Sequence, residues 1–153
     1  HGSDAGGLTT AARRDGGHYV IDGVKRYITN ARQAQVFIVM ARTDLESRDA
    51  AGISAFIVPA DTPGIRCGPA DRKMGQDGSA TSEVFFDGAR IPAANLIGGR
   101  EGGGFKTAMR GINHARLHVA VTCVGQAERL IEEALAHAVN RRQFGQPLAE
   151  FQL

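Results

Sequence analysis

Short apolar runs separated by turn signals occupy the first two thirds of the chain. Apolar or alternating runs bounded by turn signals predict strands over 8–14, 18–22, 24–29, 36–42, 53–58, 65–67, 82–86 and the segment leading to Ile91. Asp15-Gly16-Gly17 and Asp22-Gly23 are typical of hairpin turns, and Asp87-Gly88 separates a last pair of strands. Short strands at this spacing predict an antiparallel β-barrel or β-sandwich.

The stretch from Val36 to Ala41 is apolar at every position. Such a run is typical of a strand buried on both faces. A polar loop over 43–52 follows it, and the strand over 53–58 ends at Pro59.

After Gly102-Gly103-Gly104 the spacing of apolar residues changes to that of a helix. One face of this long helix is formed by Leu117, Val121, Val124, Ile131, Leu135 and Ala138. We expect the helix to begin near Phe105 and to end at Gly145 and Pro147. The predicted fold class is therefore α+β: a β-barrel or β-sandwich followed by one long helix of an incomplete bundle. Because little else in the chain can cover the apolar face, we expect partner helices from further sequence or another subunit.

Composition and charge exclude several classes of protein. The 153 residues are 42% hydrophobic and 22% charged, as in globular proteins, and the net charge of +2 comes from scattered side chains that do not favour nucleic-acid binding. No apolar run approaches the roughly 20 residues that cross a bilayer. Cys67 and Cys123 have no metal-binding spacing, so we expect two reduced thiols in the cytosol. The histidines show no such spacing either, so we expect no metal site at His114, His118 or His137.

Both ends of the sequence look cut. The chain starts without methionine inside a glycine-rich segment and stops just after a turn signal. We therefore expect an internal fragment of a longer protein.

The segment Tyr27-Ile28-Thr29-Asn30 carries the first candidate chemistry. Alternation along a strand would send Tyr27 and Thr29 to one face and Ile28 to the other. A flat apolar surface beside a hydroxyl suits a planar heteroaromatic ligand. A cross-strand Tyr and Thr pair of structural value is the plainer alternative.

Further motifs accompany this segment in a fixed order. They are Gly2-Ser3-Asp4, Lys73-Met74-Gly75-Gln76, Ile91 to Gly98, and Arg141-Arg142-Gln143-Phe144-Gly145. In this order and at these separations, the motifs resemble the acyl-CoA dehydrogenase family of flavoproteins over essentially the whole chain. The resemblance implies that 1–100 form the middle β domain and that 101–153 form the first long helix, truncated, of the C-terminal helical domain.

The resemblance also implies non-covalently bound FAD. Tyr27 stands where the family usually has Trp and would pack on the isoalloxazine, while Thr29 would hydrogen-bond the flavin near N5. Ser79 and Thr81 would contact its pyrophosphate or ribityl chain, although Asp77 replaces a usual arginine nearby. A solvated polar turn is the alternative for this loop.

The remaining implied contacts lie near the two ends of the sequence. Ser3 would lie beside both the flavin and the pantetheine of the substrate, and Asp4 would hold that loop by binding backbone N–H groups. Arg116 would contact the CoA portion. The flavin of a neighbouring subunit would be contacted by Arg141, Gln143, Phe144 and Gln152. The alternative for Ser3 is an ordinary turn serine, and for Arg116 it is an arginine on the helix surface. The alternative for the segment from Arg141 is a basic helix C-terminus.

The implied reaction is oxidation of an acyl-CoA thioester to the trans-2-enoyl-CoA, by removal of an α-proton and transfer of the β-hydride to FAD N5. Glutamate is the usual base, but the position used by a minority of the family holds Ala115, and Glu128, Glu132 and Glu133 occupy ordinary helix-surface positions. We therefore assign no catalytic residue. Expected partners are the acyl-CoA substrate, an electron-transfer flavoprotein or similar acceptor, and further subunits in a homotetramer (a dimer of dimers), in the cytoplasm or the mitochondrial matrix of a eukaryote.

Two alternatives stay open. Acyl-CoA oxidases, nitroalkane oxidases and flavin-dependent monooxygenases share the architecture but differ in oxygen access and in the catalytic acid or base. A non-enzymatic β module with an oligomerising helix would explain the strands and the apolar face without a cofactor.

Overall fold

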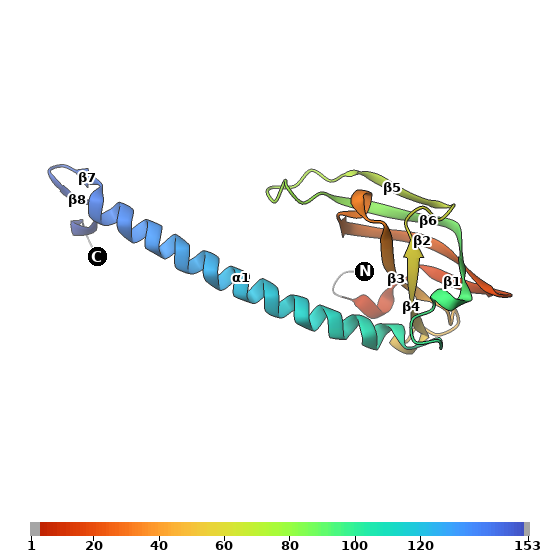
Figure 1. The fold of residues 1–153 in the computed structure, drawn as a ribbon. Helices are drawn as coiled ribbons and strands as arrows, with labels where there is room; N and C mark the ends of the chain where they lie inside the picture. Colours follow the sequence, from red (N-terminus) through yellow and green to blue (C-terminus); the bar gives the residue numbers. More distant parts are fainter. Residues whose placement is uncertain (1–3, 152–153) are drawn as a thin grey trace. The chain divides into compact units, whose positions relative to one another are not determined.

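The computed structural model describes residues 4–151 and divides the chain into two compact units, the first ending at Met109 and the second beginning at Arg110. A six-stranded sheet forms most of the first unit (Figure 1). The second holds most of helix α1 (Gly104–Asn140) and a short hairpin. The predicted class, a β domain followed by one long helix, is confirmed.

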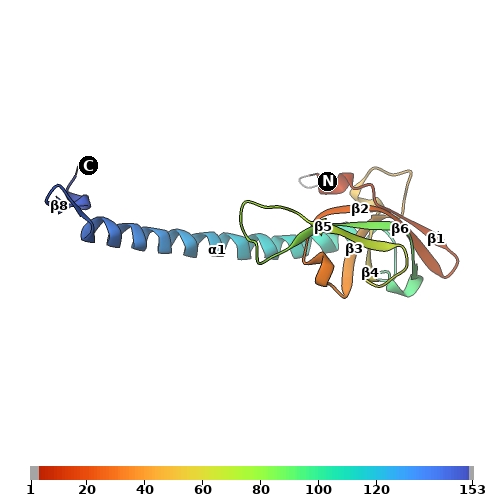
Figure 2. The ribbon, with the colours of Figure 1, turned by 90° about the horizontal axis from the view of Figure 1, so that it is seen from above.

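The sheet has the strand order β4-β3-β1-β2-β6-β5. Its strands are β1 (Ala11–Asp15), β2 (His18–Thr29), β3 (Val36–Arg42), β4 (Ile53–Pro59), β5 (Ile65–Ala70) and β6 (Thr81–Pro92). All neighbours are antiparallel except β1 and β3, which run parallel and share the single residue pair Ala11 and Arg42. The sheet is curled, so that β3 and β4 run across the direction of β5 and β6 (Figures 1 and 2).

The curled sheet encloses an apolar core. Its largest fully buried side chains include Tyr19, Phe56, Ile21, Ile91 and Val58. The rings of Tyr19 and Phe56 lie 4.9 Å apart and tilted, an arrangement that favours aromatic packing. The Tyr19 hydroxyl donates to Glu101 Oε1 at 2.5 Å, which ties the segment before α1 to β2. Burial, with this hydrogen bond, raises the pKa of Tyr19 to about 12.

Two predicted turns are wrong and form one β-bulge instead. Asp22-Gly23 lies inside the continuous strand β2, and Asp87-Gly88 lies opposite it inside β6. The Asp22 carboxylate accepts the Gly88 N–H at 2.7 Å, which satisfies a donor that the bulge removes from the ladder. Gly23 has a φ of 143°, and a Cβ there would lie 2.8 Å from Thr10 Cα, so only glycine fits.

Strand β3 is not buried on both faces. Phe37 and Val39 are buried, whereas Val36 and Ile38 are 51% and 58% exposed. Ile57 of β4 lies directly opposite Ile38 and is exposed as well. The strand therefore alternates as a half-buried strand does, and its outer face is apolar and exposed among the described residues.

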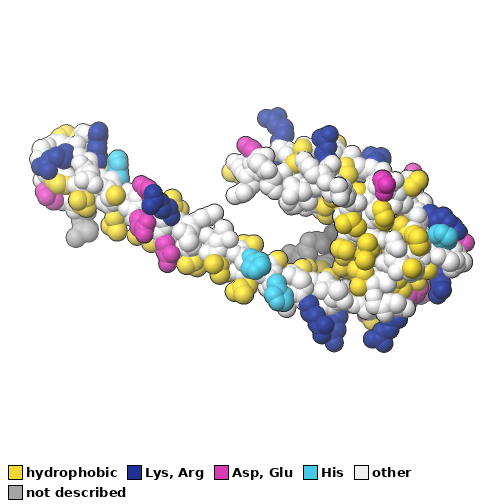
Figure 3. Space-filling view, viewed as in Figure 1, with side chains coloured by type: hydrophobic (Ala, Val, Ile, Leu, Met, Phe, Trp, Pro, Cys, Tyr) yellow, Lys and Arg dark blue, Asp and Glu magenta, His cyan; other side chains and the backbone are white. Residues whose placement is uncertain are grey.

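Helix α1 begins where its first residue can approach strand β4. A Cβ on Gly104 would lie 2.3 Å from the Ser54 carbonyl carbon, so the absence of a side chain permits the contact. Further along, the predicted apolar face is exposed, with Leu117, Val121 and Leu135 each more than 60% accessible. Apolar side chains accordingly line the helix in Figure 3.

The helix ends five residues earlier than predicted. The helix ends at Asn140, and Gly145 lies in the turn between the two-residue strands β7 (Arg142–Gln143) and β8 (Gln146–Pro147). Phe144 and Gly145 have φ values of 49° and 83°. Positive φ at both central residues is the signature of a type I′ hairpin turn, which the sequence reading had taken for a helix stop.

No helix within residues 4–151 is long and apolar enough to cross a membrane.

Candidate functional site

The candidate site in the first unit begins at the end of strand β2. Tyr27 is 71% exposed and has a φ of 58°, in the left-handed region that bulky residues rarely adopt. A register shift between Lys25 and Ile28 accompanies it. This second bulge interrupts the regular alternation from which the sequence placed Tyr27 and Thr29 on one face. Backbone strain of this kind persists only where surrounding structure fixes it, and it is common at ligand sites.

Thr29 and Thr81, chosen separately from the sequence, lie directly opposite each other in the β2–β6 ladder. The ladder continues past them, because the Asn30 N–H donates to the Ala80 carbonyl at 2.7 Å. Thr29 is exposed, whereas Thr81 is 9% exposed. Two hydroxyl side chains are thereby placed at the same end of the sheet as the exposed Tyr27 ring.

The loop between β5 and β6 brings Ser79 to this end. Lys73 fastens the loop from within, since its ammonium donates to the Gln76 carbonyl at 3.0 Å and also to the Ser79 carbonyl. The Ser79 N–H in turn donates to the Gln76 carbonyl at 3.0 Å. Asp77 is exposed at the tip. Tyr27, Thr29, Ser79 and Thr81 therefore belong to one region of the first unit, which we call the β2–β6 end.

Two buried polar atoms at the β2–β6 end lack a partner within the described part of the chain. They are Ser82 Oγ and Asp71 Oδ2. Ser82 pairs with Ile28 in the ladder, and the Asp71 N–H donates to the Thr81 carbonyl at 2.8 Å. Buried polar atoms are normally hydrogen-bonded, so the unpaired Asp71 Oδ2 fits a polar ligand or ordered water here. Ser82 shares the core-facing side of the ladder with Ile28, so its Oγ fits ordered water and not a ligand on the Thr29 side.

A buried arginine that the sequence reading missed fixes the start of the first unit. Arg42 is 8% exposed, and its guanidinium donates to the carbonyls of Gly6 (2.7 Å), Leu8 (3.3 Å), Ser47 (2.7 Å) and Asp49 (3.0 Å). Its neutral partners satisfy the donors that burial removes from water. The only signal was a cation ending an apolar run.

The segment held by Arg42 includes the 3₁₀ turn η1 (Ala5–Gly7). The predicted role of Asp4 is confirmed, because its Oδ1 accepts the Gly7 N–H at 3.2 Å. Ser3, which precedes it, lies outside the described residues.

The second unit brings three further predicted residues together at the end of α1. The Arg141 carbonyl accepts the Leu148 N–H at 2.8 Å, and Gln143 pairs with Gln146 across the hairpin. Phe144 is 94% exposed at the turn, with its ring 6.1 Å from that of Phe151 in an edge arrangement. An exposed aromatic ring beside an arginine suits a flat anionic ligand. Gln152 lies outside the described residues.

Arg116 lies apart from this hairpin, nearer the start of α1. Its guanidinium donates to Asn113 Oδ1 at 3.0 Å, one turn earlier on the helix. The same helix face has a shallow apolar hollow lined by Ile112, Ala115, Arg116, Val119 and Ala120. Arg116 could therefore place a charge at the edge of an apolar contact.

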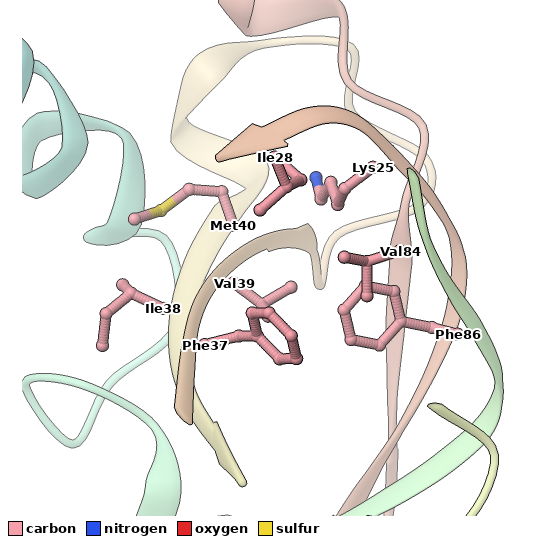
Figure 4. A pocket seen from close by; sticks show the side chains of 8 residues that line it. All are labelled: Lys25, Ile28, Phe37, Ile38, Val39, Met40, Val84 and Phe86. Carbon is pink, nitrogen blue, oxygen red and sulfur yellow. The ribbon is translucent and has the colours of Figure 1, made fainter. Parts of the chain in front are cut away.

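An apolar pocket of about 190 Å³ in the first unit contains one ionisable group, Lys25 (Figure 4). Burial lowers the pKa of its ammonium from 10.5 to about 8. The sequence reading did not select this lysine, because one cation in an alternating strand gives no signal. Within residues 4–151, no group of three or more His, Cys, Asp or Glu side chains could hold a metal ion.

Family comparisons cover both units. The family model described as acyl-CoA dehydrogenase, middle domain, matches residues 1–89, and that described as acyl-CoA dehydrogenase, C-terminal domain, matches residues 102–153. Cyclohexane-1-carbonyl-CoA dehydrogenase of Geobacter metallireducens is 42% identical over 152 residues, which are 99% of this chain but 39% of that protein.

Two solved structures with the same architecture are a dehydrogenase and an oxidase by name. The acyl-CoA dehydrogenase of Geobacillus kaustophilus has a TM-score of 0.93 at 36% identity, covering 99% of this chain and 40% of its own. The prolyl acyl carrier protein oxidase AnaB has a TM-score of 0.91 at 34% identity, covering 99% and 39%. The chain thus spans about two fifths of the length of the relatives that it matches.

Proposed function

Because this chain belongs to the acyl-CoA dehydrogenase family, we propose that the protein containing it oxidises an acyl-CoA thioester to the trans-2-enoyl-CoA. The observation that carries the proposal is the β2–β6 end, where Thr29 and Thr81 face each other in the ladder close to the strained, exposed Tyr27. We assign residues 1–100 to the middle β domain and 101–153 to the start of the C-terminal helical domain.

The β2–β6 end is the proposed flavin site, with FAD as the cofactor. The Tyr27 ring offers a flat apolar surface, and the hydroxyls of Thr29, Ser79 and Thr81 offer hydrogen bonds to polar edges of the flavin. The unpaired Asp71 Oδ2 fits a ligand with polar groups at this position. When bound, the flavin supplies the acceptor for the hydride that leaves the β-carbon of the substrate.

The segment around η1 is the proposed start of the acyl-CoA site. Arg42 and Asp4 hold the backbone of this segment at Gly6 and Gly7, and Ser3, which precedes it, is proposed to contact the thioester and the flavin. Preorganisation of this kind lowers the entropic cost of binding. Arg116 is proposed to bind the CoA portion through its guanidinium, which suits phosphate.

The α-proton would be removed by a carboxylate that this chain does not supply. Glu132 and Glu133 both pair with Arg129 on the exposed surface of α1, and Glu128 is likewise an exposed helix residue. The strong base of the reaction is therefore assigned to another part of the complete protein. No residue of this chain is proposed to be catalytic.

An oligomer is proposed from two features of the second unit. The exposed apolar side chains of α1 require partner helices, and the hairpin with Arg141, Gln143 and Phe144 would reach the flavin of a neighbouring subunit, together with Gln152. We propose a homotetramer built as a dimer of dimers, with an electron-transfer flavoprotein or similar protein as the electron acceptor. The cytoplasm, or the mitochondrial matrix in a eukaryote, remains the proposed compartment.

An oxidase is the second candidate function. The prolyl acyl carrier protein oxidase AnaB, to which this chain is similar, is named as an oxidase and has the same architecture. Nitroalkane oxidases and flavin-dependent monooxygenases belong to the same alternative, and differ in how oxygen reaches the flavin.

The test is a visible spectrum of the complete protein, followed by anaerobic addition of a panel of acyl-CoA thioesters. Bleaching of the oxidised-flavin band by one thioester, with release of the enoyl product, would support the dehydrogenase. Reoxidation of that flavin by air as fast as substrate reduces it would favour the oxidase. A colourless protein that also fails to bind added FAD would overturn the cofactor proposal, and with it the roles of Tyr27, Thr29 and Arg141.

A further inference from the structure

Lys25 is partly exposed, and its amine lies in an apolar pocket of the first unit. It projects from strand β2, and Figure 4 shows its nitrogen beside Ile28, within the space bounded by Phe37 and Phe86. The pocket is lined otherwise by apolar side chains from β2, β3 and β6 alone. Such surroundings favour the neutral form of an amine over the ammonium.

No carboxylate in the described part of the chain neutralises this amine. Lys25 takes part in none of the ion pairs formed among residues 4–151. The nearest acidic residue along the facing strand is Glu83, which precedes the Lys25 partner Val84 and therefore points to the opposite face of the sheet. There Glu83 pairs with Arg26 at 3.0 Å. Strand β3 contributes no ionisable side chain to the pocket.

Two uncharged polar groups lie near this row, the Ser82 hydroxyl, two residues before Val84, and a thiol. Cys67 of β5 also pairs with Val84, on the side away from Lys25, and its Sγ donates to the Ala31 carbonyl at 3.5 Å. Nothing in the pocket therefore stabilises the charged form of Lys25. At pH values near 8 a large fraction of this lysine is the free amine, which is the nucleophilic form.

We propose that Lys25 is a modification site that acyl-CoA thioesters acylate at Nζ. The free amine attacks the thioester carbonyl carbon, an N–C amide bond forms, and the C–S bond breaks. The coenzyme A thiolate leaves and takes up the proton lost by the nitrogen, so no other reactant is needed. The proposal rests on the proposed function for one point only, namely that the complete protein binds acyl-CoA as its substrate.

The pocket also suits the product. An acyl amide carries no charge, so its formation removes the cost of keeping an ammonium in apolar surroundings. The acyl chain would extend among apolar side chains. At about 190 Å³ the space is smaller than the roughly 300–1,000 Å³ of pockets for drug-sized ligands, so short chains of a few carbons fit best.

The chain provides its own internal comparison, because its lysines are Lys25, Lys73 and Lys106. Lys73 and Lys106 are both exposed. The experiment is incubation of the complete protein with acetyl-CoA, followed by peptide mass spectrometry of the three sites over time. Acetyl-CoA has no β-carbon and cannot undergo dehydrogenation, so acylation is measured separately from the proposed oxidation.

We expect Lys25 to be acetylated about tenfold faster than Lys106 at pH 8, because its larger free-amine fraction outweighs the lower nucleophilicity that accompanies a lower pKa. Its rate should level off above about pH 8, whereas the Lys106 rate should keep rising towards pH 10. Butyryl-CoA should preserve the preference.

Two variants of a pocket residue make the test specific. Ile28→Glu places a carboxylate beside Lys25 and should slow its acetylation to the Lys106 rate, whereas Ile28→Leu should leave the preference intact. Circular dichroism of each variant verifies that the sheet is folded. Lys25→Arg should remove the adduct altogether.

Acetylation of Lys25 at or below the Lys106 rate in the folded protein would overturn the proposal. A pH profile for Lys25 that matches that of Lys106 would overturn it as well. The preferred adduct in a protein that binds no flavin would support this site while contradicting the proposed function, so the two failures are distinguishable.

Discussion

The guanidinium of Arg42, at the end of β3, donates a 2.7 Å hydrogen bond to the carbonyl of Gly6 in the turn η1. The same guanidinium holds the carbonyls of Ser47 and Asp49 in the loop that follows β3. Two segments far apart in the sequence therefore share one buried cation. The position of the segment that leads to Ser3 depends on a residue outside every motif.

Arg42→Met should release both segments. The substitution leaves four carbonyls without their donor, and we expect a loss of about 3 kcal/mol in the free energy of unfolding. Arg42→Lys should recover part of this loss, since an ammonium keeps the charge but not the planar fork. Denaturant unfolding and hydrogen exchange of residues 5–8 measure the effect. Arg32→Met removes an exposed guanidinium and should change stability little; equal losses at positions 32 and 42 would contradict the assigned role.

Tyr27 should give opposite effects on stability and on flavin binding. Tyr27→Gly removes a side chain from a left-handed backbone conformation, so we expect a gain of about 1 kcal/mol in the free energy of unfolding. The same change removes the aromatic surface and should weaken flavin binding. Tyr27→Trp should retain the flavin. Thermal unfolding and flavin titration of the three proteins check this, and a Gly variant that binds flavin as tightly as the parent would exclude Tyr27 from the site.

Thr29→Val keeps the shape of the side chain and removes its hydroxyl. Loss of one hydrogen bond to the flavin should weaken its binding by about 1 kcal/mol, or roughly fivefold. Equilibrium dialysis against FAD provides the measurement. Thr122→Val on α1 removes a hydroxyl that donates to the His118 carbonyl and serves as the control. Unchanged affinity in the Thr29 variant would leave Thr29 with only its cross-strand role opposite Thr81.

Gly104 and Gly111 should respond oppositely to alanine. Gly104→Ala would push a Cβ to within 2.3 Å of the Ser54 carbonyl carbon, and we expect destabilisation by about 3 kcal/mol. Gly111 lies within the same helix with open space around it, so Gly111→Ala should stabilise by about 1 kcal/mol. Thermal melts of both variants test the contact. Similar behaviour of the two would mean that α1 does not begin against β4.

The lowered pKa of Lys25 should make stability rise with pH. Below about pH 8 the lysine is protonated in both the folded and the unfolded chain. Between pH 8 and 10.5 the unfolded chain binds more protons than the folded one, so the free energy of unfolding increases. We expect a gain of about 2 kcal/mol from pH 8 to pH 10.

The Tyr19 hydroxyl opposes this trend only at higher pH. Its raised pKa of about 12, against 10.0 ordinarily, stabilises the fold below pH 10 and loses that contribution between pH 10 and 12. Urea unfolding at pH 8 and pH 10 therefore isolates Lys25. Lys25→Met should flatten the dependence, and a flat profile in the parent protein would show that the ammonium is fully solvated.

Patterns of apolar residues predicted the elements well where one local signal decided the outcome. The long helix followed from periodicity and the strands around Phe37 and Phe56 from short apolar runs, although the helix ends five residues earlier than predicted and β3 is buried on one face only. Asp-Gly pairs were misread because the dipeptide specifies positive φ without saying whether the chain reverses. The two Asp-Gly pairs lie opposite one another, at Gly23 and Gly88, and form a bulge. A bulge depends on how the two strands pair, and no local sequence signal contains that information.

The candidate site was predictable for the same reason in part only. Motif order selected Thr29 and Thr81, and the ladder places them opposite each other. The roles of Thr29 and Thr81 in a flavin site stay proposals that rest on the family, as do those of Tyr27, Ser79, Arg116, Arg141, Gln143 and Phe144. Arg42 and Lys25 were missed because their importance comes from burial, and burial of a single cation arises from tertiary packing that the sequence pattern does not display.

The single pair between β1 and β3 leaves most of one side of β1 open among the described residues. An open strand side exposes backbone groups that can recruit a strand from another molecule, which leads to aggregation. Three successive charged side chains, Arg13, Arg14 and Asp15, occupy that stretch and are exposed. Incoming chains would have to bury those charges, so the open side of β1 is protected against fibre growth.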